Sequence, residues 1–135
     1  MSILDDFADR LSTAGVATTG TNLFKGRMPA GPDELLALFN TGGPAPVHAM
    51  GPSLSRPLAE QPHVQILCRS DRPDSALFLI RKAALALDRF NGTINGIAYR
   101  SIFAIQDPFY VYEDESGRPV FSVNFEAVRD PATSS

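Results

Sequence analysis

The sequence predicts a single α+β domain, and two neighbouring stretches carry this prediction. Between His63 and Gln106 a strand, an amphipathic helix and a second strand follow one another. Residues 108–127 then form an aromatic strand, a polar turn and an alternating apolar and polar strand, which is typical of an antiparallel hairpin. With 135 residues, 44% of them hydrophobic, the chain can form one core but is too short for two ordinary domains. We therefore expect one domain over residues 1–130 and a flexible tail over residues 131–135.

The first expected element is a helix over residues 3–13. Ser2 and Asp5 resemble a capping box, and apolar residues then recur at helical spacing. A weak strand is expected over residues 22–26. Residues 35–40 form a short apolar run that fits either a strand or a helical turn.

Residues 42–62 form a long segment that fits neither a helix nor a strand. The segment contains three glycines and five prolines, and its apolar residues show no period. Loops of this length without internal structure are usually functional or disordered. Disorder in the isolated protein and order gained on assembly both fit this composition.

A buried strand is expected over residues 63–69, because its middle is apolar and β-branched. A helix that begins at Pro73 and continues to Phe90 is expected to follow it. Pro73 suits the first turn of that helix, where a missing N–H costs nothing. Ser70 and Asp71 both fit as caps for the free amides just before it.

This helix has one apolar face, which needs a sheet beneath it. Gly92 is expected to end the helix, since glycine accepts the left-handed conformation common at helix C-termini. Phe78 and Leu85 fall among the charged residues of the opposite side, either as two exposed apolar side chains or as a subunit contact. The apolar face consists of Leu77, Ile80, Ala84 and Leu87, with Ala76 and Ala83 beside them.

The strand after the helix is expected over residues 97–106, preceded by an Asn95-Gly96 turn. In the closing hairpin, Phe109 and Tyr112 fit the core or a surface equally well. In the strand over residues 97–106, strict alternation places Ile97, Tyr99, Phe103 and Ile105 on one face of the sheet. It places Ala98, Arg100, Ile102 and Ala104 on the other face.

The residues contain no recognisable catalytic or metal-binding pattern. His48 and His63 have no cysteine or carboxylate at ligand spacing. Cys68 lies within a predicted buried strand, which suits a small core residue better than a nucleophile beside its base. Asp5 and Asp6 begin a helix, where the dipole favours negative charge, and are expected to be solvated. We therefore expect no catalytic residue, no metal and no cofactor.

Composition excludes two further classes of protein. The net charge is −3 and no dense Lys and Arg cluster appears, which argues against a dedicated nucleic-acid binder. No apolar run approaches the roughly 18 residues of a membrane helix, so we expect a protein that folds in a cytoplasm. The residues alone leave open a small cytoplasmic enzyme or ligand-binding domain with a pocket near Asp33, His48 and His63, or a regulatory protein-binding module.

A series of short motifs runs through most of the chain. They are Gly26-Arg27-Met28-Pro29, Pro32-Asp33, Ala37-Leu38-Phe39-Asn40-Thr41-Gly42-Gly43, Val64-Gln65-Ile66-Leu67-Cys68-Arg69 and Gly117-Arg118-Pro119-Val120-Phe121-Ser122-Val123-Asn124-Phe125. The helix and the strand around Tyr99 lie between the last two. In order and spacing the chain resembles the small minor-capsid or tail-completion proteins of tailed bacteriophages.

The resemblance implies a virion structural protein with a tail terminator-like fold, in which a mixed, mostly antiparallel sheet is flanked by two helices. It also favours a strand over residues 35–40. In that group a homohexameric ring caps the finished tail tube and presents a surface to the head connector, without catalytic residues or a cofactor. A head-side neck or stopper role is the alternative that the resemblance leaves open.

The partners implied by the resemblance are other copies of the chain, the tail tube protein and the head-tail connector or stopper protein. DNA would pass through the lumen of the ring without sequence-specific binding, and no membrane is involved. The implied location is the tail or neck of the virion, after assembly in the host cytoplasm.

A ring requires a heterologous interface, in which one patch meets a different patch on the neighbour. The loop over residues 42–62, the aromatic strand and the exposed pair on the helix are the expected patches. Glu113, Asp114 and Glu115, here called the acidic turn, are expected to line the lumen, because carboxylates and phosphates repel within a Debye length of about 8 Å. The interface candidates are Phe39, Asn40, Thr41, Gly42, Gly43, Phe78, Leu85, Phe109, Tyr110 and Tyr112.

Overall fold

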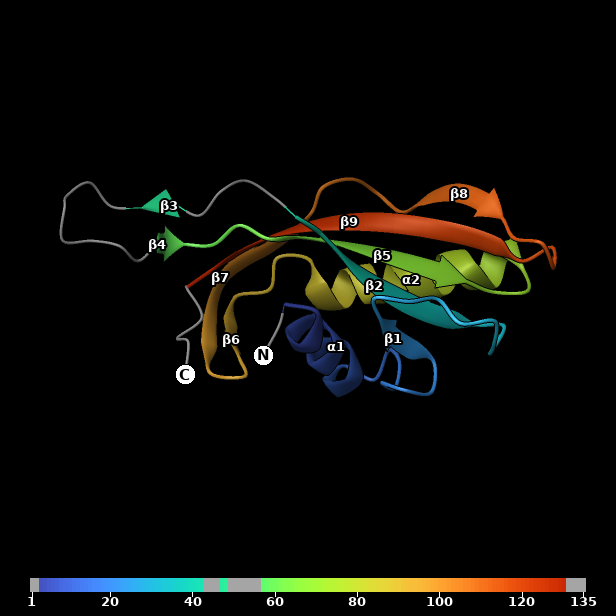
Figure 1. Cartoon of the computed structure of the whole chain (residues 1–135), viewed down its shortest axis with the longest axis horizontal. Helices are drawn as coiled ribbons and strands as arrows, with labels where there is room; N and C mark the ends of the chain where they lie inside the picture. The colour runs from blue at the N-terminus through green and yellow to red at the C-terminus, as the bar shows by residue number, and fades with distance from the viewer. Residues whose placement is uncertain (1–2, 43–46, 49–56, 131–135) are drawn as a thin grey trace.

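A mixed seven-stranded sheet forms the centre of the protein, and both helices pack against the same face of it (Figure 1). The computed structural model describes residues 3–42, 47–48 and 57–130, so the tail predicted over residues 131–135 lies outside the described residues. The elements are α1 (Ile3–Thr13), β1 (Leu23–Lys25), β2 (Leu35–Gly42), β3 (Val47–His48), β4 (Pro57–Ala59), β5 (His63–Arg69), α2 (Pro73–Leu87), β6 (Gly92–Ile94), β7 (Ile97–Ala104), β8 (Phe109–Glu113) and β9 (Pro119–Arg129).

The strands of the main sheet follow the order β1-β2-β5-β9-β7-β6, and β8 also pairs with β9. Among the described strand pairs, only β1 and β2 run parallel. The prediction of an α+β fold with a mixed, mostly antiparallel sheet and two helices is therefore confirmed. β9 pairs with β5 along one edge and with β7 and then β8 along the other, which places the last described strand in the middle of the sheet.

The N-terminal elements confirm the sequence predictions. α1 has the predicted bounds of residues 3–13, with acidic residues in its first turn. β1 lies inside the weak strand expected over residues 22–26. β2 shows that residues 35–40 form a strand rather than a helical turn, and the strand continues to Gly42.

α2 begins at Pro73 as predicted, but its first turn has no side-chain cap. Its N-cap residue is Arg72, in an extended conformation. The Ser70 hydroxyl donates instead to the carboxylates of Asp71, at 3.2 Å, and Glu34, at 3.4 Å. The prediction that Ser70 or Asp71 caps the helix is therefore wrong, because the Ser70 hydroxyl hydrogen-bonds to carboxylates rather than to the helix amides.

α2 ends at Leu87, three residues before the predicted end. Arg89 takes the left-handed conformation, with φ 62°, that the sequence assigned to Gly92. Its backbone N–H donates to the carbonyl of Ile102 at 2.6 Å, and the Asp88 carboxylate accepts a backbone N–H from β7 at 2.9 Å. These bonds to β7 replace a further helical turn. The predicted helix end was wrong because tertiary contacts, rather than the local sequence, end α2.

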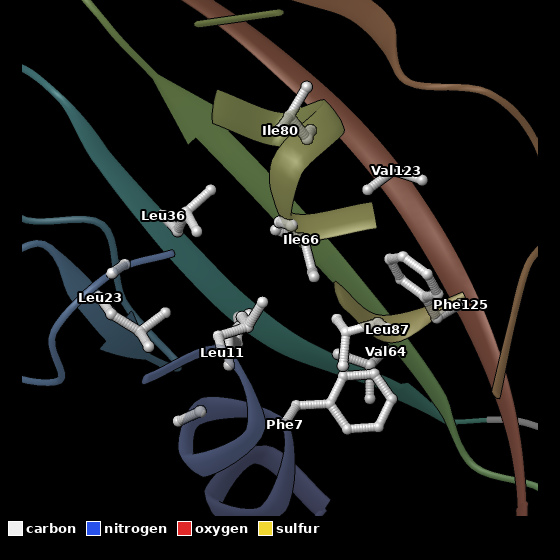
Figure 2. Close-up of a cluster of buried hydrophobic side chains, with 14 of the residues drawn as sticks. Phe7, Leu11, Leu23, Leu36, Val64, Ile66, Ile80, Leu87, Val123 and Phe125 are labelled. Atoms are coloured by element: carbon white, nitrogen blue, oxygen red, sulfur yellow. The ribbon is translucent and has the colours of Figure 1, made fainter. Parts of the chain in front are cut away.

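The core lies between the two helices and the central strands (Figure 2). Phe7 of α1 and Phe125 of β9 meet edge to face, with ring centroids 6.2 Å apart and an interplanar angle of 75°. Leu11, Leu87 and Val64 are fully buried in the same cluster. Burial of each such side chain stabilises the fold by roughly 1.5–3 kcal/mol, which fixes both helices on this face of the sheet.

A β-bulge in β7 reverses the faces predicted for the second half of that strand. The register with β9 shifts between Tyr99 and Ser101, so Arg100 is an extra residue on the β7 side. Tyr99 and Ile102 are therefore both buried, at 1% and 0% exposure, while Phe103 is 49% exposed. The prediction of two strictly alternating faces is wrong, because one inserted residue moves every later side chain to the other face.

The segment predicted to lack regular structure contains two short strands. β3 and β4 pair antiparallel as a separate two-stranded sheet, which lies beyond the end of the main sheet (Figure 1). Glu60 then exchanges two backbone hydrogen bonds with Arg129, at 2.9 and 3.0 Å, and so rejoins the main sheet. The prediction of one loop over residues 42–62 is wrong at these strands, and residues 43–46 and 49–56 lie outside the described part of the chain.

Cys68 is a core residue, as predicted. Its side chain on β5 is fully buried, and its Sγ donates to the carbonyl of Ala76 on α2 at 3.4 Å. Burial is the main reason that the pKa of the Cys68 thiol is raised to about 12. The thiol is therefore protonated and inaccessible in the folded protein at neutral pH.

We expect Cys68 in the folded protein to resist thiol reagents at pH 8, because the reactive thiolate forms only when the core opens. The same chain in denaturant should react fully, with one thiol per chain, and provides the control. The pKa of the Cys68 thiol in the folded protein, about 12, lies above the unfolded value of about 8.5. The contribution of this thiol to the free energy of unfolding is therefore complete below about pH 8.5 and is lost as the pH rises towards 12. Rapid labelling of the folded protein at pH 8 would contradict the buried position.

Candidate assembly surfaces

The outer side of α2 carries two exposed apolar side chains. Phe78 is 68% exposed and Leu85 is 82% exposed. They lie two helical turns apart, on the side opposite the residues that α2 buries against the sheet. Arg81 and Lys82 lie between them, and the Lys82 ammonium is 5.5 Å from the centroid of the Phe78 ring. We call Phe78, Arg81, Lys82 and Leu85 the helix ridge.

Open grooves border both ends of the helix ridge. Phe78 and Lys82 line a groove of about 460 Å³ beside Val16. Leu85 and Arg81 line a second groove, of about 400 Å³, between α2 and the segment that links β7 to β8. The ridge is therefore a contoured surface rather than two isolated apolar side chains.

β8 presents a second exposed apolar surface at the edge of the sheet. Phe109, Tyr110, Val111 and Tyr112, here called the aromatic edge, are each between 41% and 54% exposed. The sequence left open whether Phe109 and Tyr112 lie in the core or on the surface, and the structure places both on the surface. Tyr110 packs edge to face on Phe121, with centroids 5.7 Å apart, and this contact orients the strand. Among the described strands, β8 pairs only with β9.

The apolar surface continues from β8 onto β7, where sequence reasoning missed it. Phe103 pairs with Glu126 and Phe109 pairs with Ser122, so both lie on the face of the sheet that the helices leave uncovered. Ile105, between them, is 52% exposed. Alternation had assigned Phe103 and Ile105 to the same face as the core residue Tyr99. Nothing in the local sequence reveals the bulge that separates them.

The acidic turn contains two kinds of carboxylate. Asp114 accepts hydrogen bonds from the backbone of Ser116 at 3.0 Å and of Arg118 at 2.8 Å, and from the Arg118 guanidinium at 2.9 Å. The backbone bond from Arg118 is the largest of the contacts that lower the pKa of Asp114. Glu113 and Glu115 are exposed on either side of it. Asp114 therefore fixes the conformation of the turn, while the two glutamates are free to meet a partner.

The residues at the end of β2 lie at the other end of the sheet from the acidic turn. Asn40 pairs with Val64 and Gly42 with His63, whereas Arg69, at the far end of β5, pairs with Val120. Phe39 is half-buried, and Asn40, Thr41 and Gly42 are exposed. Gly43 lies outside the described residues. The interface candidates therefore form three groups, on the end of β2, on α2 and on β8.

The three residues of the alternative pocket do not come together. Asp33 lies beside Arg69, whose guanidinium donates to the carbonyl of Pro32 at 2.7 Å. His63 is at the opposite end of β5, roughly 20 Å away for seven residues of strand. The side chain of His48 lies outside the described residues. In the described part of the chain, no three metal-binding side chains gather into a site.

A buried polar cluster joins α1 to the last strand. Asp6 is fully buried, which shows that the prediction of a solvated helix start was wrong for this residue. Its carboxylate accepts hydrogen bonds from the Tyr99 hydroxyl, from Asn95 at 2.8 Å and from Arg129 at 3.5 Å. Arg129 also donates to Glu60 at 3.0 Å. The cluster is structural, since it connects α1, the β6–β7 hairpin, β9 and the chain after β4.

Comparisons with known proteins point to one family. A family model described as bacteriophage tail terminator protein matches residues 10–131. Among solved structures, a chain from a structure titled "Virion of native gene transfer agent (GTA) particle" has a TM-score of 0.66 and 13% sequence identity, with 96% of each chain covered. At that identity the likeness shows the fold. A comparison with curated protein sequences gives no significant match, and the described residues include no helix long and apolar enough to cross a membrane.

Proposed function

Since this chain belongs to the bacteriophage tail terminator family, we propose that it caps the finished tail tube as a homo-oligomeric ring and joins the tube to the head connector. The family match makes the protein a structural component of a phage-type virion rather than an enzyme. The ring, its six-fold symmetry, its contacts with the tube and connector proteins and its assembly in the host cytoplasm are the parts that we propose. DNA would pass through the lumen without sequence-specific binding.

The observation that carries the proposal is the pair of exposed apolar surfaces on different parts of the molecule. Soluble monomers rarely expose large contiguous apolar patches, and such patches commonly mark protein interfaces. The helix ridge points away from the sheet on the helix-covered side, whereas the aromatic edge lies along a sheet margin. Two different patches on one chain suit a heterologous interface, which closes into a ring when the rotation between neighbours permits it.

The ends of the sheet are the proposed contacts with the other virion proteins. Phe39, Asn40, Thr41 and Gly42 lie at one end, near the β3–β4 sheet, while the exposed segments around Asp33, before β2, and Asp71, after β5, lie at the other. A ring subunit between two partners needs contact surfaces facing in opposite directions. The separation of these two groups along the strands supports such an arrangement.

The native mass of the purified protein, alone and mixed with tail tubes, tests the proposed function. We expect a ring in solution, or a monomer that becomes a ring at one tube end, and electron microscopy of tube ends should show a six-fold cap. Binding to isolated connectors but not to tubes would indicate a head-side stopper instead. A monomer that binds neither tubes nor connectors would contradict the proposal.

A further inference from the structure

We propose that the helix ridge of one copy binds the aromatic edge and acidic turn of the next copy, so that the same head-to-tail contact repeats around the ring. This inference rests on the proposed ring and adds to it the identity of the two surfaces that meet. The partner that binds the helix ridge is therefore a second copy of this chain, and the opposite charges of the two surfaces favour this partner.

The helix ridge combines apolar and cationic groups. Phe78 and Leu85 are its most exposed apolar side chains, and Arg81 and Lys82 project between them. Neither cation forms an ion pair with another residue in the described ranges. The Lys82 ammonium lies over the Phe78 ring, so a partner that covers the ring would also contact this cation. The ridge therefore offers two apolar contacts, Phe78 and Leu85, with two cations between them that have no ion-pair partner in the described ranges.

The aromatic edge offers the complementary set of groups. Tyr110 and Tyr112 are about half exposed, and Glu113 and Glu115 follow them directly. Within the described part of the chain, both glutamates are without an ion-pair partner. The hydrogen bonds of Asp114 to Ser116 and Arg118 hold the backbone of the turn in one conformation, so the backbone that carries the glutamates is already ordered before a partner binds. Tyrosines beside carboxylates match a surface of apolar groups beside cations.

The positions of the two surfaces make pairing between copies head to tail. The ridge faces away from the sheet, and the edge runs along the sheet margin, so the two surfaces of one molecule do not face each other. Two ridges brought together would place Arg81 and Lys82 against like charges, and two acidic turns would repel in the same way. Contact between unlike surfaces avoids both repulsions. This assignment moves Glu113 and Glu115 from the lining of the lumen, where the sequence placed them, to the subunit interface.

Two charge-reversed variants test the pairing. R81E/K82E reverses the ridge, and E113K/E115K reverses the turn. Each variant alone brings like charges together at every interface, so its self-association should be at least tenfold weaker than that of the wild type at low salt. Mixed in equal amounts, the two variants should recover association, because each contact in an alternating ring then joins opposite charges. Native mass spectrometry and sedimentation velocity measure both results.

The control variant R27E/R72E makes the same change in net charge away from the ridge, at two exposed arginines, and should assemble like the wild type. Thermal melting confirms that each variant is folded. Rings formed equally well by the wild type and by both reversed variants would overturn the pairing while leaving the ring in place. Failure of the mixture to recover would overturn it as well.

Tail tubes provide the second arm of the test. Reversed variants that form normal rings but no longer bind tubes would assign these surfaces to the tube protein and overturn the pairing. Wild-type protein that remains monomeric both in solution and with tubes would overturn the proposed ring together with the pairing. The two failures are therefore distinguishable.

Discussion

Replacing Asp6 by alanine is expected to lower the free energy of unfolding by about 3–5 kcal/mol, the range found when one partner of a buried ion pair is removed. Asp6 is fully buried and accepts hydrogen bonds from Tyr99, Asn95 and Arg129. Without the carboxylate, the buried Tyr99 hydroxyl and the Arg129 guanidinium lose their shared acceptor. Urea unfolding monitored by circular dichroism measures the loss as a shift of the midpoint with an unchanged slope.

Asp9→Ala is the matched control for this prediction. Asp9 lies one helical turn after Asp6 and accepts a hydrogen bond from the same Asn95 amide at 2.8 Å, but its side chain is exposed. Exposed substitutions away from the core usually change stability by less than about 0.5 kcal/mol. Equal effects of Asp6→Ala and Asp9→Ala would contradict the buried cluster.

Ile102→Ala is expected to destabilise the protein by about 2–5 kcal/mol, whereas the neighbouring Phe103→Ala should cost less than about 1 kcal/mol. Ile102 is fully buried and Phe103 is 49% exposed. Strict alternation from the buried Tyr99 predicts the reverse order, with Phe103 in the core and Ile102 outside it. The pair of substitutions therefore measures directly whether the bulge at Arg100 exists in solution.

Urea unfolding of the two variants, together with the wild type, decides this prediction. A larger loss for Phe103→Ala than for Ile102→Ala would show that β7 pairs with β9 without the bulge. Phe103→Ala has a second use, because Phe103 belongs to the exposed surface that continues from the aromatic edge. A folded Phe103→Ala variant that assembles poorly would extend the subunit interface onto β7.

The sequence predicts the parts of this fold that depend on local patterns. The bounds of α1 follow from the helical spacing of its apolar residues, and the start of α2 follows from Pro73, which suits the first turn of a helix. The Asn95-Gly96 turn is present between β6 and β7. The exposure of Phe78 and Leu85 could also be predicted, since a helical wheel places both among charged residues. These features need no knowledge of which strands pair.

The features that the sequence could not predict depend on long-range contacts. The end of α2 is set by hydrogen bonds from Arg89 and Asp88 to β7, and no local pattern encodes them. The burial of Asp6 depends on Arg129, 123 positions later in the chain. The bulge at Arg100 likewise depends on the register with β9. The sequence therefore predicts the candidate surfaces at the end of β2, on α2 and on β8, but not the extension of the apolar surface from β8 onto β7.

The position of β9 has a consequence for the order in which the protein can fold. β9 is the last described strand in the chain, yet it pairs with β5 on one side and with β7 and β8 on the other. Pairings between distant residues are slow to form, and here the sheet cannot be completed until residues 119–129 have been synthesised. Ribosomes add only about 5–20 residues per second, so β5 and β7 present unpaired backbone to other nascent chains for seconds. A period of vulnerability to aggregation, which lasts until β9 completes the sheet, follows from this strand order.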